Sequence, residues 1–203
     1  MSFEDLPVIP RPEQWRNLDG VVLLDKPVGL TSNQALQWSR RLFAANKGGH
    51  TGTLDPFATG VLPLCLGEAT KFSADLLNAD KTYLATIKFG TTTTTGDAEG
   101  EVIATHAVDI SREQLEAACK AFIGEISQVP PMYSALKFEG KSLYAYAREG
   151  VEIERQARIV HINSIQIESF KDDVAQITVG CSKGPIFEPW LKTSPTRWVP
   201  VPI

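Results

Sequence analysis

Hydrophobic and polar residues alternate along several stretches of the chain, and this two-residue period is typical of β-strands with one covered face. The clearest stretch is Lys81–Phe89, in which Tyr83, Ala85 and Ile87 fall on the same face as Phe89. Such a strand is expected to be half-buried. The same period predicts two further strands, at residues 160–170 and 174–181.

Two apolar runs without this period also predict strands. Residues 20–25 contain four consecutive aliphatic side chains, which favours a short buried strand. Gly60–Leu66 is apolar but contains Pro63, so an irregular strand is expected there. Residues 91–100 are expected to form a turn region, 101–104 another strand and 137–141 a tight hairpin.

Helix signals occur in four places. Thr31 or Ser32 can cap a helix that reaches about Ala45, and Ser111 can cap a second helix. Shorter helices are expected at residues 68–77 and 143–149, the latter closed by Gly150. The inward-facing residues of the two longer helices would be Ala35, Leu36, Leu42 and Phe43, and Leu115, Ala118 and Phe122. Because strands outnumber helices without strict β-α-β order, the pattern predicts an α+β fold with a mixed sheet.

Composition sets bounds on the class of protein. The chain has 203 residues, 43% of them apolar, which is enough for one large or two small domains. Its three cysteines and three histidines are scattered, which argues against a structural zinc site and suits a reducing compartment. The first residues lack an apolar signal core, and no apolar run reaches membrane-spanning length. We therefore expect a cytoplasmic protein without a metal.

The net charge of −4 does not by itself suggest a nucleic-acid partner, since RNA-binding surfaces are basic. A local positive surface can nevertheless exist on an acidic chain. On surface composition, each basic cluster is more often a solvated face than a phosphate contact. The candidate clusters are Arg40 and Arg41 with Lys47, Lys137 with Lys141, and Arg148 with Arg155 and Arg158.

The strongest candidate for chemistry is a glycine-rich segment at residues 48–56. Gly49 and Gly52 allow backbone conformations closed to other residues, and Pro56 disfavours a helical conformation at Asp55. A carboxylate presented at such a rigid turn can act as a nucleophile or as a base. Asp-Pro is also a common turn sequence, so the residues alone leave a purely structural role open.

The wider segment, residues 49–64, resembles the signature of the TruB family of tRNA pseudouridine synthases, in its bacterial form. In that family the aspartate of this motif is catalytic, which corresponds to Asp55. Three further blocks are similar to family motifs in the same order: Asp25-Lys26-Pro27 with Gly29, Thr31 and Ser32; Lys81-Thr82-Tyr83 with the segment to Asp97; and residues 128–150.

The resemblance implies a central, largely antiparallel sheet crossed by a catalytic cleft, and an RNA substrate. The enzyme would extrude a uridine of the tRNA T-arm and stack its base on Tyr83, with His50 where the T-loop pairing is disrupted. The motif residues that would support Asp55 are Lys26, Pro27, Gly52, Thr53 and Leu54. The family's chemistry calls for no metal or cofactor, and a monomer is expected.

Two routes remain open for the Asp55 carboxylate. It can attack the uracil ring, or it can attack the anomeric carbon of the ribose after deprotonation. In both routes the C–N glycosidic bond breaks, the base rotates and a C–C bond forms. An alternative to catalysis is a protein of the same fold that binds or helps to fold tRNA without turnover, or an inactive fragment.

The resemblance ends at Gly184, where the family continues with Thr-Tyr-Ile-Arg and a helix. Residues 185–203 instead contain five prolines, which exclude a continuous helix. We interpret residues 1–184 as a partial catalytic domain, 185–203 as an aberrant tail and the family's C-terminal PUA domain as absent. A single-base deletion near Gly184 would explain the tail, because one out-of-phase reading restores Thr-Tyr-Ile-Arg. The family's arginine there pairs with the catalytic aspartate, so this chain is expected to isomerise uridine weakly or not at all.

Overall fold

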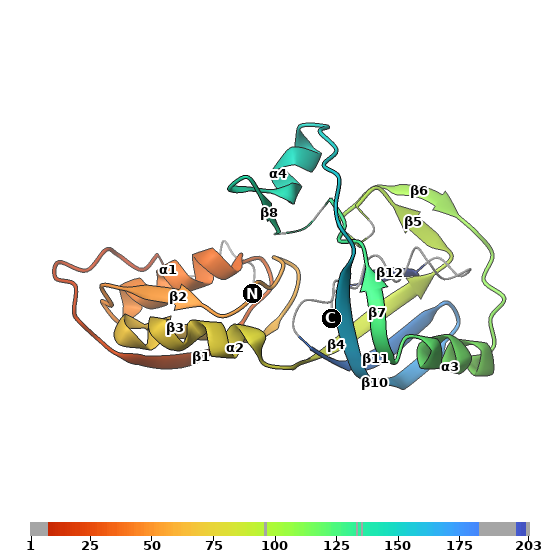
Figure 1. The fold of residues 1–203 in the computed structure, drawn as a ribbon, viewed down its shortest axis with the longest axis horizontal. Coiled ribbons are helices and arrows are strands. Elements are labelled where there is room, and N and C mark those ends of the chain that lie inside the picture. Colours follow the sequence, from red (N-terminus) through yellow and green to blue (C-terminus); the bar gives the residue numbers. More distant parts are fainter. Residues whose placement is uncertain (1–7, 96, 133, 135, 183–197, 202–203) are drawn as a thin grey trace. The chain divides into compact units, whose positions relative to one another are not determined.

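The computed structural model describes residues 8–95, 97–132, 134, 136–182 and 198–201. The chain divides into two compact units, Met1–Ala79 and Asp80–Ile203 (Figure 1). Within each described sheet the strands pair antiparallel, and a single parallel bridge joins Arg16 to Ala45. The predicted α+β class with largely antiparallel sheets is therefore confirmed.

The first unit is a three-stranded sheet with one helix on a face. The strand order is β1-β3-β2, and the helix α1 packs its buried Ala35 and Leu36 against Leu62 and Leu64 of the central strand. A 3-10 helix and a short α-helix then lead out of this unit. The elements are β1 (Gly20–Lys26), α1 (Ser32–Leu42), β2 (Gly48–His50), β3 (Gly60–Leu66), η2 (Gly67–Phe72) and α2 (Ser73–Asn78).

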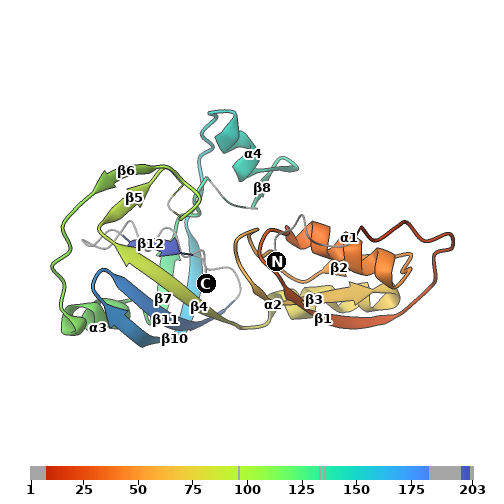
Figure 2. The same ribbon diagram turned by 180° about the vertical axis from the view of Figure 1, so that it is seen from behind.

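The second unit is built on a five-stranded sheet in the order β12-β4-β11-β10-β7. Helix α3 packs Leu115 and Cys119 into the core of this sheet (Figure 2). Two hairpins and a short helix complete the unit. The elements are β4 (Lys81–Phe89), β5 (Thr91–Thr93), β6 (Val102–Thr105), α3 (Arg112–Ala121), β7 (Gly124–Gln128), β8 (Lys137–Phe138), β9 (Lys141–Ser142), α4 (Leu143–Arg148), β10 (Arg158–Lys171), β11 (Val174–Cys181) and β12 (Trp198–Val201).

Helix α1 begins as predicted but ends earlier than expected. Thr31 is the N-cap and forms a capping box with Gln34. The helix ends at Leu42 rather than near Ala45, because Ala44 adopts a left-handed conformation with φ 53°. The amides of Ala44 and Ala45 then donate to the carbonyls of Arg41 and Arg40, which is a Schellman motif. Leu42 is 66% exposed and Phe43, at the C-cap, is 37% exposed, so the prediction that both face inward is wrong.

The prediction of a buried strand at residues 20–25 is wrong. β1 is an edge strand, and only its face with Val22, Leu24 and Lys26 is covered, while Leu23 on the other face is 70% exposed. A run of apolar residues cannot distinguish a strand covered on both faces from one covered on a single face.

The expected irregularity at Pro63 is also absent from β3, whose register with β1 is continuous from Gly60 to Leu66. The Pro63 carbonyl accepts from the amide of Thr51 at 3.1 Å, on the β2 side of the strand. In a strand the N–H and the C=O of one residue point to the same side. The N–H that Pro63 lacks would therefore point toward β2, and the pairing with β1 loses no hydrogen bond. The pairing of β2 accordingly stops at His50, one residue before the position opposite Pro63.

The other sequence predictions have mixed outcomes. The strands at residues 81–89, 160–170 and 174–181, the hairpin at 137–141 and the helices starting at 112 and 143 are confirmed. Residues 91–93 form strand β5 instead of a turn, and β2 and β7 were not predicted. The division into residues 1–184 and 185–203 stays a prediction, and residues 183–197 lie outside the described part of the chain.

Candidate active site

Asp55 lies in the loop that joins β2 to β3, and its side chain is exposed. The loop leaves the sheet at Thr51, which is 2% exposed and whose hydroxyl also donates to the Pro63 carbonyl at 3.3 Å. At Asp55 the chain turns, because the carbonyl of Asp55 accepts from the amide of Ala58 at 3.1 Å. The carboxylate is thus presented to solvent from a turn with an anchored entry.

The residue before Asp55 is held by a buried serine. Ser32, the first residue of α1, is 2% exposed, and its hydroxyl oxygen accepts from the amide of Leu54 at 2.8 Å. The same hydroxyl donates to the carbonyl of Leu54 at 3.1 Å. The Leu54 side chain packs beside the core of this unit. One side chain therefore satisfies both polar groups of the peptide units on either side of Leu54.

The residue after Asp55 is held from the segment that follows β1. The amide of Gly29 donates to the carbonyl of Pro56 at 2.7 Å, and the ammonium of Lys26 approaches the same carbonyl at 3.4 Å. Both neighbours of Asp55 are therefore tied to residues 26–32. This explains why the sequence blocks around Lys26 and Asp55 belong to a single site.

Lys26 is fully buried because of its position in β1. It falls on the same face of the strand as Val22 and Leu24, which faces the core. Its ammonium also donates to the carbonyls of Pro27 at 2.9 Å and Leu30 at 2.7 Å. Burial lowers the pKa of Lys26 from its ordinary value, while the negative charge of Asp55 acts to raise it.

These contacts give Lys26 a structural and electrostatic part in the site. Its ammonium has three N–H donors, and three backbone carbonyls lie within reach of them. Lys26 therefore links the segment after β1 to the loop that contains Asp55, which is a structural role and not that of a reacting group. Its positive charge lies near enough to Asp55 for the two charges to interact. That Lys26 supports Asp55 stays a prediction, and these contacts agree with it.

His50 is the last residue of β2 and is half-buried. Its Nδ1 lies 2.6 Å from the carbonyl oxygen of Gly52. Because a carbonyl can only accept, Nδ1 must carry the proton, and in the neutral ring Nε2 is then an acceptor. His50 is thus fixed at the start of the loop that presents Asp55, in a strand rather than in the turn that the glycine pattern suggested.

The remaining candidates have distinct surroundings. Gly52 has a φ of +147°, in the region that favours glycine, whereas Gly49 lies in β2 without a positive φ. Thr53 is exposed in the loop. Tyr83 belongs to the second unit, where it lies in β4 opposite Val179 and packs beside that unit's core while staying partly exposed.

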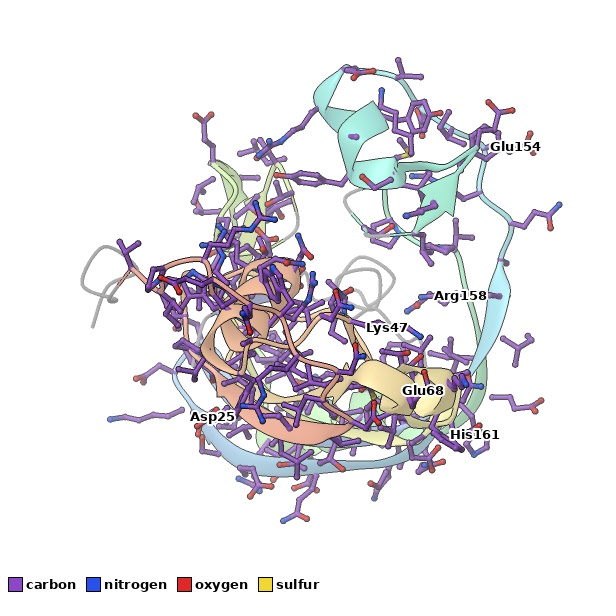
Figure 3. The ribbon with its side chains drawn as sticks, turned by 90° about the vertical axis from the view of Figure 1, so that its left-hand side faces the viewer. Asp25, Lys47, Glu68, Glu154, Arg158 and His161 are labelled. Carbon is purple, nitrogen blue, oxygen red and sulfur yellow. The ribbon has the colours of Figure 1, made fainter. Side chains whose placement is uncertain are left out.

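Most of the basic clusters named from the sequence are engaged within the chain. Lys141 pairs with Glu149, Arg155 pairs with Glu152, and Arg148 lies over the ring of Tyr144. Arg158, which lies on β10 with His161 (Figure 3), donates to the side-chain oxygen of the buried Gln128 at 3.5 Å, and burial lowers its pKa. These contacts favour local structural roles for four members of the two clusters in the second unit, namely Lys141, Arg148, Arg155 and Arg158.

The described residues contain no group of three or more histidine, cysteine, aspartate or glutamate side chains that could hold a metal ion. Within the same part of the chain, no helix combines the length and the apolar character that crossing a bilayer requires.

The chain matches a known protein family. The model of the TruB family pseudouridylate synthase (N terminal domain) matches residues 40–186, and the chain belongs to this family. A tRNA pseudouridine synthase B of Dechloromonas aromatica (strain RCB) is 60% identical over 170 residues, which are 84% of this chain and 57% of that protein. The namesake from Neisseria meningitidis serogroup B is 60% identical over 171 residues, 84% of this chain and 56% of that one. The chain thus spans little more than half the length of these relatives.

Solved structures share the fold. The archaeal box H/ACA sRNP Nop10-Cbf5 complex contains a chain that is 27% identical, with a TM-score of 0.57, covering 83% of this chain and 39% of that one. A chain of a Cbf5-Nop10-Gar1 complex, at 23% identity and a TM-score of 0.65, covers 95% of this chain and 54% of that one, which supports the fold alone.

Proposed function

We propose that this chain carries the catalytic site of a tRNA pseudouridine synthase that isomerises the T-loop uridine of tRNA. The observation that carries the proposal is the position of Asp55. Its carboxylate is exposed, its two neighbours are anchored through Ser32, Gly29 and Lys26, and it occupies the catalytic position of the family motif. A fixed geometry of this kind suits a residue that must meet one atom of a bound substrate.

The chemistry requires that the uridine leave its stack in the RNA. The everted base would stack on the ring of Tyr83, which offers a flat face and a hydroxyl group. Asp55 then attacks either the uracil ring or the anomeric carbon, and both routes stay open. The C–N bond breaks, the base turns, and bonding through carbon 5 releases the hydrogen of that carbon to water.

A second candidate is an RNA-binding protein of this fold that does not turn over. It is favoured by the sequence of residues 185–203, which departs from the family after Gly184, and by a family match that ends at residue 186. The family's Thr-Tyr-Ile-Arg segment would supply the arginine partner of the aspartate. Without that arginine, the site would have one positive charge fewer to favour the ionised form of Asp55.

A single experiment separates the two candidates. The purified chain, in excess over a T-arm hairpin tritiated at carbon 5 of uridine, is assayed for tritium release, while binding of the same hairpin is measured at a stated salt concentration. Slow release with binding supports the synthase. Binding without release supports the non-catalytic protein, and the absence of both excludes an RNA substrate of this kind.

A further inference from the structure

The first unit has a basic hollow at the end of α1 that is remote from Ser32. It measures about 440 Å³ and is lined by Arg11, Trp15, Gln37, Arg40, Arg41 and Asn46. Arg41 lies nine positions after Ser32 in α1, which corresponds to about 13.5 Å along the axis. The hollow is therefore distinct from the loop that presents Asp55.

The walls of the hollow are held by specific contacts. The segment before β1 is fixed to the turn after α1, because the amide of Arg16 donates to Ala44 at 2.6 Å and the amide of Asn46 donates back to Arg16 at 2.9 Å. The guanidinium of Arg40 lies 5.3 Å from the centre of the Trp15 ring. The side of the hollow formed by Arg40 and Trp15 is thus held in place by the fold.

Arg40 is committed to this framework. Three of its N–H groups donate to the carbonyl of Ala45 at 3.3 Å, the carbonyl of Asn46 at 2.7 Å and the side chain of Gln37 at 3.0 Å. Arg11 and Arg41 are exposed, and Arg41 makes a long contact of 3.5 Å with the carbonyl of Ile9. The N–H groups of these two guanidinium groups can therefore donate hydrogen bonds to a ligand.

The charge of the hollow is one-sided. Among the described residues its lining has three arginines and no carboxylate, in a chain whose net charge is −4. The arginine side chains are not needed to cap the C-terminus of α1. The carbonyls of Arg40 and Arg41 already accept hydrogen bonds from the amides of Ala45 and Ala44. Paired guanidinium groups without a carboxylate are suited to a phosphate, which each can bind through two parallel N–H donors.

We propose that this hollow binds a backbone phosphate of the RNA substrate, held by Arg11 and Arg41 against the wall formed by Arg40 and Trp15. The inference rests on the proposed function, since it takes the ligand to be the RNA that Asp55 acts on. It assigns to the first unit a sequence-independent contact that positions the RNA without touching the reacting uridine.

The test compares two double variants that each remove two positive charges. In R11Q/R41Q the proposed phosphate site is lost, whereas R112Q/K120Q changes exposed residues of α3 in the second unit. The dissociation constant of the T-arm hairpin is measured at several KCl concentrations between about 50 and 200 mM. We expect the dissociation constant of R11Q/R41Q to rise about 10-fold, with a log–log salt slope smaller by about one, and R112Q/K120Q to match the unmodified chain.

The outcomes distinguish this inference from the proposed function. If R11Q/R41Q binds as tightly as R112Q/K120Q, the phosphate site is excluded while the proposed function stands. At saturating RNA the tritium release rate of R11Q/R41Q should equal that of the unmodified chain, because the contact is made away from the reacting atoms. If the unmodified chain does not bind the hairpin, both proposals fail. Equal melting temperatures of the variants exclude misfolding as the cause.

Discussion

The hydroxyl of Ser32 binds the backbone of Leu54 twice, accepting from its amide at 2.8 Å and donating to its carbonyl at 3.1 Å. The bond spans 22 positions in sequence and links the start of α1 to the residue before Asp55. Since Ser32 is 2% exposed, water cannot readily replace it. We therefore expect Ser32 to be a positioning residue for Asp55.

Replacing Ser32 by alanine should slow tritium release about 10- to 100-fold while leaving the affinity for RNA within about 2-fold. The change affects the position of the Asp55 carboxylate but removes no contact with the RNA. Stability should fall by about 1–3 kcal/mol, since a buried amide loses its acceptor. The matched control is Ser39→Ala, a buried serine of the same helix, which should leave the release rate unchanged. Ser32→Thr, which keeps the hydroxyl, should restore part of the rate. Equal release rates for both alanine variants would contradict this role.

Lys26→Met should destabilise the first unit by about 2–3 kcal/mol, because buried carbonyls lose a charged donor. The pKa of Lys26 is lowered in the folded state, so the folded chain releases this proton at a lower pH than the unfolded chain does. Raising the pH toward the ordinary value of 10.5 must then favour the folded form of the unmodified chain. The stability gap to Lys26→Met should widen over that range in urea titrations, and a gap that narrows would contradict the burial of the ammonium.

Ala44→Gly should stabilise the chain by about 1 kcal/mol. Ala44 has a φ of 53° at the end of α1, a conformation that costs a residue with a Cβ about 1–2 kcal/mol and that glycine adopts freely. Ala118→Gly, within helix α3, is the control and should destabilise by about 1 kcal/mol. Thermal unfolding of both variants gives the comparison, and a lower melting temperature for Ala44→Gly would show that the Schellman ending is not formed.

The buried cysteines should resist alkylation in the native state. Burial is the main cause that raises the pKa of Cys119 and of Cys181 to about 11 from 9.0. At pH 8 the thiolate fraction is then about 100-fold smaller than in an unfolded chain, and access is restricted as well. Iodoacetamide should label them only after urea is added. Because their folded pKa is raised, their contribution to stability is complete below pH 9 and is lost as the pH rises through 11.

The sequence predicted the elements that rest on local signals. Thr31 and Ser111 begin their helices as expected, since capping involves residues three apart. The alternation of Lys81–Phe89 likewise identified the covered face of β4. These features depend on neighbours in the chain and hence can be found without tertiary information.

What the sequence could not show depends on distant partners. Glycine-rich β2 carries no strand signal and exists because β3 pairs with it. The burial of Lys26 was hidden by its charge, although its two-residue spacing from Leu24 placed it on the covered face of β1. The contact of the Arg40 guanidinium with the Trp15 ring joins α1 to the segment before β1, and no sequence pattern connects these two segments. The family motif identified Asp55, whereas its anchoring through Ser32 required the fold.

The most direct test of the account is tritium release from a T-arm hairpin by Asp55→Asn, under single-turnover conditions. Asp109→Asn is the matched control, since Asp109 is an exposed aspartate of the second unit, outside the family blocks. We expect slow release by the unmodified chain and by Asp109→Asn, and a loss of at least about 1,000-fold in Asp55→Asn with RNA binding retained. Release by Asp55→Asn at the rate of the control would contradict the assignment of Asp55 as the catalytic residue.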